Sequence, residues 1–151
     1  MKHIKTFVAA AAAMVFSTFA TGTFAQDAAQ DPGPIAYAKA LNGKRVMLVP
    51  MTMGFDLAQG WAAYIKKEVE AWGGIFETRD PNWSVDAGAQ AITDAINSET
   101  RPDVLIVHSP DLNSYSRLAK KAQQAGTYVI LVDTPTNSPA DAFVGSDWDR
   151  L

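Results

Sequence analysis

The sequence predicts an α/β fold, a doubly wound parallel sheet with flanking helices. Short apolar runs recur along the chain, and the strongest lack the polar alternation of half-exposed strands, as expected of strands buried on both faces. Segments with one apolar face at helical spacing lie between these runs. The runs begin 29, 29 and 25 residues apart, the length of repeated strand–helix–strand units. They are Val46–Val49, Ile75–Thr78, which is the weakest, Val104–Val107 and Val129–Val132.

Three amphipathic helices are expected between these strands. In the first, Asp56 with Gln59 three residues later resembles a capping box, so we interpret Asp56 as a helix cap. The second is expected to begin after Ser84 as its N-cap. The stripes expected to face the core are Leu57, Trp61, Ile65, Val69 and Trp72, then Val85, Ala89, Ile92 and Ile96, then Tyr115, Leu118, Ala122 and Ala125.

The chain is expected to be exported. A basic start, an alanine-rich apolar run and a small-residue stretch ending at Ala25 form the pattern of a cleaved signal peptide over residues 1–25. The apolar run is too short for the roughly 20 residues of a membrane span. Residues 26–43, rich in Ala, Gln, Asp and Pro, are interpreted as a flexible lead-in, and residues 44–151 as the folded domain. Because a fifth strand at Phe143–Val144 has no following helix, we expect this domain to be incomplete.

Composition excludes several kinds of function. After cleavage at Ala25 the chain keeps 11 Lys and Arg and 16 Asp and Glu, a net charge of −5. This acidity argues against nucleic acid, which is bound by clustered basic side chains. With no cysteine, disulfides and thiol catalysis are excluded, and with His108 as the only remaining histidine a multi-histidine metal site is excluded too. We predict no cofactor and no metal.

Candidate ligand-binding residues follow the strands, because ligands bind beyond the carboxyl ends of parallel strands. Asp133 is a carboxylate able to accept hydrogen bonds from adjacent hydroxyls. Phe55 and Trp148 offer flat apolar faces for a sugar ring. Two alternatives stay open: Asp133 as a turn residue that bonds its own backbone, and Trp148 as a packing residue.

Enzymatic function is not expected. The loop after the first strand has one glycine, Gly54, and no lysine, so it lacks the elements of a phosphate-binding loop. Ser109, His108 and Asp111 are the components of a hydrolase triad, but neighbours at one strand end point in different directions. No serine lies in a Gly-x-Ser-x-Gly turn. We predict no catalytic residues.

The succession of motifs in the second half of the chain resembles the ribose-binding protein family, the substrate-binding components of bacterial sugar ABC transporters. The resemblance covers about residues 44–151. It is carried by Pro-Asp-Val-Leu-Ile-Val at 102–107, Ala-Lys-Lys-Ala-Gln-Gln-Ala-Gly at 119–126, Tyr-Val-Ile-Leu-Val-Asp at 128–133 and Phe-Val-Gly-Ser-Asp at 143–147.

This resemblance implies a two-lobed periplasmic protein whose lobes close on a ligand, with this chain as most of the amino-terminal lobe. It also implies sugar contacts from Thr52, Met53 and Phe55, from His108, and from Asp133 with Thr134. Two positions depart from the family, which often has asparagine at His108 and arginine at Thr134. Loss of a guanidinium removes a rigid donor fork, so the ligand is not restricted to an ordinary pentose or hexose.

We therefore expect a periplasmic protein that captures a small hydroxylated ligand, a sugar or polyol, and presents it to the permease of an ABC transporter. The alternative is a periplasmic sensory protein that reports its ligand to a receptor histidine kinase. The expected ligand-binding residues are Thr52, Met53, Phe55, His108, Asp133, Thr134 and Trp148.

Overall fold

The fold is a five-stranded parallel sheet in the order β2-β1-β3-β4-β5, flanked by helices. A computed structural model describes residues 33–146. The helices are α1 (Gly33–Leu41), α2 (Asp56–Ala71), α3 (Val85–Asn97) and α4 (Ser116–Gln124), and the strands are β1 (Arg45–Val49), β2 (Ile75–Thr78), β3 (Val104–Val107), β4 (Tyr128–Val132) and β5 (Ala142–Val144).

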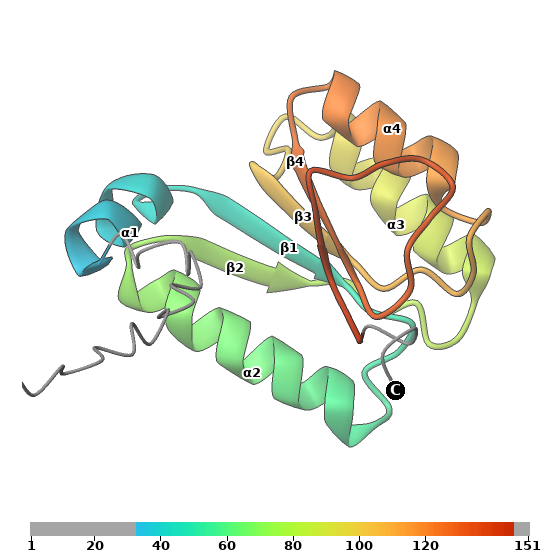
Figure 1. Cartoon of the computed structure of the whole chain (residues 1–151), viewed down its shortest axis with the longest axis horizontal. Coiled ribbons are helices and arrows are strands. Elements are labelled where there is room, and N and C mark those ends of the chain that lie inside the picture. Colours follow the sequence, from blue (N-terminus) through green and yellow to red (C-terminus); the bar gives the residue numbers. More distant parts are fainter. Residues whose placement is uncertain (1–32, 147–151) are drawn as a thin grey trace, which may run out of the picture. The chain divides into compact units, whose positions relative to one another are not determined.

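Helices cover both faces of the sheet, with α2 on one face and α3 and α4 on the other (Figure 1). Successive strand residues point to opposite faces, so the strands contribute to two cores. Met47 and Leu105 pack with Ile92 of α3 and Ala119 of α4. On the α2 side, the core of buried residues is Val46, Leu48, Ala62, Val69 and Ile106.

The expected doubly wound parallel sheet and all five predicted strands are confirmed, within one residue at each predicted start. The prediction of a flexible lead-in is wrong for Gly33–Leu41, which forms α1. Leu41 packs against the core on the α2 side, and the Gly43 N–H donates to the carbonyl of Gly73 at 2.9 Å. The alanine content that suggested an irregular segment suits a helix equally well. The predicted signal peptide and the first part of the lead-in lie outside the described residues.

The predicted core stripe of α2 is only partly correct. Val69 is buried, but Leu57 is 51% exposed and Trp61 is half-buried. Besides Val69, the buried positions of α2 are Ala58 and Ala62, whose small side chains let the helix backbone pack closely. The large side chains of the first two turns, Leu57 and Trp61, are less buried than these alanines.

Of the two helix caps predicted from the sequence, one is confirmed and one is wrong. Ser84 is the N-cap of α3, and its Oγ accepts a hydrogen bond from the Ala87 N–H at 3.1 Å, as predicted. The capping box at Asp56 is wrong, since Phe55 is the N-cap of α2 and makes no side-chain cap. Gln59 instead donates through Nε2 to the carbonyl of Met53 at 3.0 Å, which ties the β1–α2 loop to the helix.

The strand order fixes where a ligand site can form. From β1 the chain moves first to β2 on one side and then to β3 on the other, so the order reverses between β1 and β3. In open parallel sheets this reversal opens a crevice at the carboxyl ends of the strands. No helix within residues 33–146 is long and apolar enough to cross a membrane.

Candidate ligand-binding site

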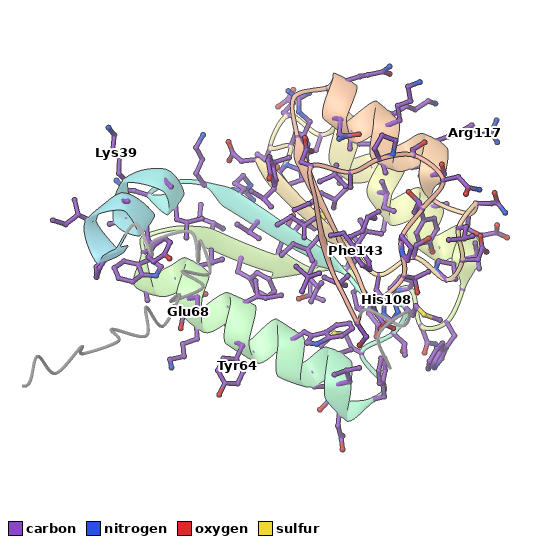
Figure 2. All side chains as sticks on the ribbon, in the orientation of Figure 1. Lys39, Tyr64, Glu68, His108, Arg117 and Phe143 are labelled. Atoms are coloured by element: carbon purple, nitrogen blue, oxygen red, sulfur yellow. The ribbon has the colours of Figure 1, made fainter. Side chains whose placement is uncertain are left out.

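His108 lies at the carboxyl end of β3, next to the point where the strand order reverses. It directly follows β3, and its N–H donates to the carbonyl of Val49 at 3.0 Å, so it continues the pairing of β3 with β1. Its side chain is buried, with the residue 5% exposed. The ring of Trp61 from α2 lies 5.4 Å away, edge to face. Figure 2 shows His108 at the edge of the sheet where the strands end.

His108 is joined to Asp133, which follows β4. The Nε2 of His108 lies 3.3 Å from the Oδ2 of Asp133. Burial lowers the pKa of His108, and this effect outweighs the nearby carboxylate, which acts to raise it. The imidazole is therefore neutral at pH 7, and the contact is a hydrogen bond donated by Nε2–H. The other nitrogen, Nδ1, is buried without a hydrogen-bond partner in the described part of the chain.

A tight turn places the Asp133 carboxylate. Asp133 has a φ of 63°, and the Thr134 N–H donates across it to the carbonyl of Val132 at 2.7 Å. The left-handed region is uncommon outside glycine, and Asp and Asn enter it more readily than most residues. The turn is closed by the backbone, and the side chain is bonded to His108, so the alternative of Asp133 as a self-bonding turn residue does not describe this structure. Its side chain stays 44% exposed and reachable by a ligand.

The loop after β1 is held by its own polar groups. Thr52 is fully buried, and its Oγ1 accepts from the Gly54 N–H at 3.0 Å. The Met53 N–H donates to the Oδ1 of Asp80 at 3.0 Å. Phe55 stacks on Trp83, with ring centroids 5.7 Å apart. The hydroxyl of Thr52 is thus used to shape the loop, while Met53 and Phe55 are half-buried at its surface.

Of the predicted ligand residues, His108 and Asp133 are in direct contact. Thr134, which directly follows Asp133 in the sequence, is half-buried. Trp148 lies outside the described residues. Three residues that the sequence analysis did not predict as ligand residues contact the predicted ones: Trp61 contacts His108, Asp80 accepts from the Met53 N–H, and Trp83 stacks on Phe55. Trp61 could have been found from its place one helical turn inside α2, on the helix that starts at the β1 loop, but its spacing equally suggested core.

The components of a hydrolase triad are separated. Ser109 donates through Oγ to the carbonyl of Asp111 at 2.7 Å. The carboxylate of Asp111 accepts from the backbone N–H groups of Asn113 and Ser114. The Ser114 hydroxyl and these two N–H groups lower the pKa of Asp111. The Ser109 hydroxyl is thus bonded to a backbone carbonyl, and the Nδ1 of His108 has no hydrogen-bond partner among residues 33–146, so no hydrogen bond joins His108 to Ser109 there.

An apolar groove of about 560 Å³ lies on the α2 face of the sheet and reaches Asp133. It is lined by Leu48, Leu57, Trp61, Tyr64, Ile65, Ile106, Ile130, Val132, Asp133, Val144, Gly145 and Ser146. Between residues 33 and 146, no group of three or more histidines, cysteines or acids is placed to hold a metal ion.

The lowered pKa of His108 predicts how stability depends on pH. Between its native pKa and about 6.5, the unfolded chain binds more protons than the native one. Stability is therefore complete above about pH 6.5 and falls as the pH is lowered through this window. Urea midpoints of the chain without residues 1–25 should decrease as the pH is lowered from 7.5 to 5. His108→Asn should flatten that slope, since Asp103 and Asp111, whose pKa values are also lowered, titrate below this range. A midpoint that is flat or rises on acidification would contradict the assignment.

Solved proteins share this fold. The Caulobacter myo-inositol binding protein bound to myo-inositol is 18% identical, with a TM-score of 0.62, over 69% of this chain and 35% of that one. An ABC transporter solute binding protein from Clostridium phytofermentas with bound L-rhamnose is 20% identical, with a TM-score of 0.62, over 69% and 32%. Another from Mycobacterium smegmatis with bound glycerol is 24% identical, with a TM-score of 0.63, over 70% and 36%. The chain spans about one third of the length of these structures.

A search of the curated proteins found no match. The family model described as periplasmic binding protein domain, however, matches residues 46–151, which is more than half of the chain. This match agrees with the parallel sheet and its flanking helices. The chain belongs to the periplasmic binding protein domain family.

Proposed function

We propose that the complete protein is a periplasmic solute-binding protein that captures a small hydroxylated ligand, a sugar or polyol, without transforming it. The observation that carries this proposal is the buried His108 bonded to the half-exposed Asp133 at the crevice of the sheet. The fold relatives with bound myo-inositol, L-rhamnose and glycerol support the same class of ligand.

The chemistry of the pair suits neutral hydroxyl groups. A carboxylate accepts hydrogen bonds from two adjacent hydroxyls, and these charge-assisted bonds are stronger than those between neutral groups. Since the Nε2–H of His108 occupies only one position on the carboxylate, the exposed side remains for a ligand. The half-buried Phe55 and Met53 offer apolar surface for the C–H groups of a ring.

The proposed ligand contacts are those of the sequence analysis, with Thr134 beside Asp133. Thr52 contributes through the loop that its hydroxyl shapes, and Trp148 is included on sequence grounds. Thr134 supplies a hydroxyl and no charge, which leaves Asp133 as the charged group of the pair. An acidic site of this kind favours neutral ligands over phosphorylated or acidic sugars.

We further propose that the protein acts outside the inner membrane after cleavage of residues 1–25 and delivers its ligand to the permease of an ABC transporter. The signal-peptide pattern supports export, and the family supports transport.

Native mass spectrometry of the complete, leader-cleaved protein from its own periplasm tests the function. The difference in mass between the native and the denatured protein should match a sugar or polyol. Dialysis against guanidinium followed by refolding gives the empty control, to which the same compound should rebind. A protein that carries no extra mass, and that binds no member of a sugar and polyol panel, would contradict the capture of a small hydroxylated ligand.

A further inference from the structure

A strained turn lies on the β2 side of the crevice. Asn82 and Trp83 follow one another with φ values of 49° and 67°. Two consecutive left-handed residues other than glycine are rare, and for a bulky residue such as tryptophan this conformation is a true outlier. Strain of this kind persists where surrounding contacts hold it, and it gathers at functional sites. Here the Trp83 N–H donates to the carbonyl of Met51 at 2.9 Å, which ties the turn to the β1 loop.

This turn presents an aromatic face to solvent. The ring of Trp83 stacks on Phe55 at an interplanar angle of 25°, with centroids 5.7 Å apart. Trp83 nevertheless stays 60% exposed. A large apolar ring that is fixed on one side and open on the other is suited to pack against the C–H face of a sugar ring.

A carboxylate lies in the same turn. The Oδ1 of Asp80 accepts from the N–H groups of Met53 and Asn82, at 3.0 and 2.8 Å. These two bonds fix the orientation of the carboxylate between the β1 and β2 loops. Its Oδ2 meets no donor in the described part of the chain, and Asp80 is exposed. Asp80 therefore keeps one oriented acceptor for a ligand hydroxyl, in the same turn as Trp83.

We propose that Asp80 and Trp83, whose ring is supported by stacking on Phe55, form a second carbohydrate subsite, which takes the second ring of a disaccharide or glycoside. The proposal rests on solute capture at Asp133. Asp80 follows β2 and Asp133 follows β4, and these strands are three positions apart in the sheet. Neighbouring strands are spaced by about 4.8 Å, so the two strand ends lie roughly 14 Å apart. One sugar ring with its hydroxyls does not span that distance, whereas two linked rings do.

Calorimetry on the complete protein can test the subsite with matched pairs of sugars. The probes are D-glucose with cellobiose and maltose, D-galactose with lactose and melibiose, and D-xylose with xylobiose. At least one disaccharide should bind about tenfold more tightly than its monosaccharide, the gain expected from one aromatic contact. Trp83→Gly should abolish this advantage and leave monosaccharide affinity within about twofold.

Glycine is the chosen replacement because it adopts a φ of 67° freely, so the variant retains the turn. Trp83→Phe should keep most of the disaccharide advantage, since it keeps a ring. Asp80→Asn preserves the Oδ1 acceptor that holds the loop and should reduce disaccharide affinity alone. Tyr128→Ala removes another exposed aromatic, 48% exposed, at the opposite ends of the strands and should change neither affinity.

Each remaining outcome overturns the subsite. If every disaccharide binds no more tightly than its monosaccharide, the second ring has no site. If Trp83→Gly weakens mono- and disaccharides equally, the ring instead supports lobe closure or the first subsite, and solute capture stands. If the wild-type protein binds none of these sugars and no polyol, solute capture fails, and the subsite fails with it.

Discussion

Replacement of Asp133 by alanine should weaken binding of the retained sugar or polyol by about 2–5 kcal/mol, or roughly 30-fold to 4000-fold. The ligand's hydroxyls would lose their charged acceptor, and His108 would lose its partner. The Nδ1 of His108 is already buried without a partner among residues 33–146, so within this part of the chain the variant leaves both nitrogens of a buried ring unpaired. Calorimetry on the complete protein with the compound identified by mass spectrometry measures the effect.

Two variants separate charge from shape in that experiment. Asp133→Asn keeps an oxygen acceptor and tolerates the left-handed φ of 63°, so its loss of affinity reports the negative charge. Asp94→Ala removes a carboxylate of α3 that is bonded to Gln90 and should leave affinity unchanged. An Asp133→Ala protein that is folded and binds as tightly as the wild type would remove Asp133 from the site.

The sheet could be predicted because its central strands are buried on both faces. Val46–Val49 and Val104–Val107 are continuous apolar runs, a pattern typical of parallel strands whose two faces are both covered. Their spacing left room for one helix between strands. The strand order followed less directly, since the sequence constrains crossover handedness but not the side on which β2 pairs with β1.

The helices show where sequence patterns are insufficient. A stripe of large apolar side chains predicts the direction of burial but not its depth. In α2 the buried residues that pack with the strands are Ala62 and Val69, while Leu57 and Trp61 line the apolar groove. The cap at Phe55 was equally unpredictable, because the Gln59 side chain bonds the Met53 carbonyl in the loop and makes no capping box.

Part of the site was predictable for a topological reason. The carboxyl ends of parallel strands lie at the same end of a sheet. His108 and Asp133, which directly follow β3 and β4, therefore had to lie at that end. Their hydrogen bond also involves the left-handed backbone conformation of Asp133, which no local sequence pattern predicts. Asp80 and Trp83 were missed because β2 is the weakest run, and because the turn after it contains no glycine to mark its positive φ values.

Truncation of Leu105 tests the core that supports this site. Leu105 lies at the centre of β3, pairs with Met47 of β1 and Val129 of β4, and is 0% exposed. Its side chain packs in the cluster beneath α3 and α4. Leu105→Ala removes this packing and leaves a cavity that the sheet cannot close, because ladder bonds hold the strand on both sides. The expected loss of unfolding free energy is about 2–5 kcal/mol.

Leu112→Ala is the matched control, because the chemical change is the same at a residue that is 47% exposed. Urea denaturation of both variants should show a large fall in midpoint for Leu105→Ala and, as for most surface substitutions, a change within about 0.5 kcal/mol for Leu112→Ala. Because His108 follows β3 by one residue, loosening of that strand should also weaken the contact of His108 with Asp133. Equal losses in the two variants would mean that Leu105 is not part of a packed core, and that the strand holding His108 is supported from elsewhere.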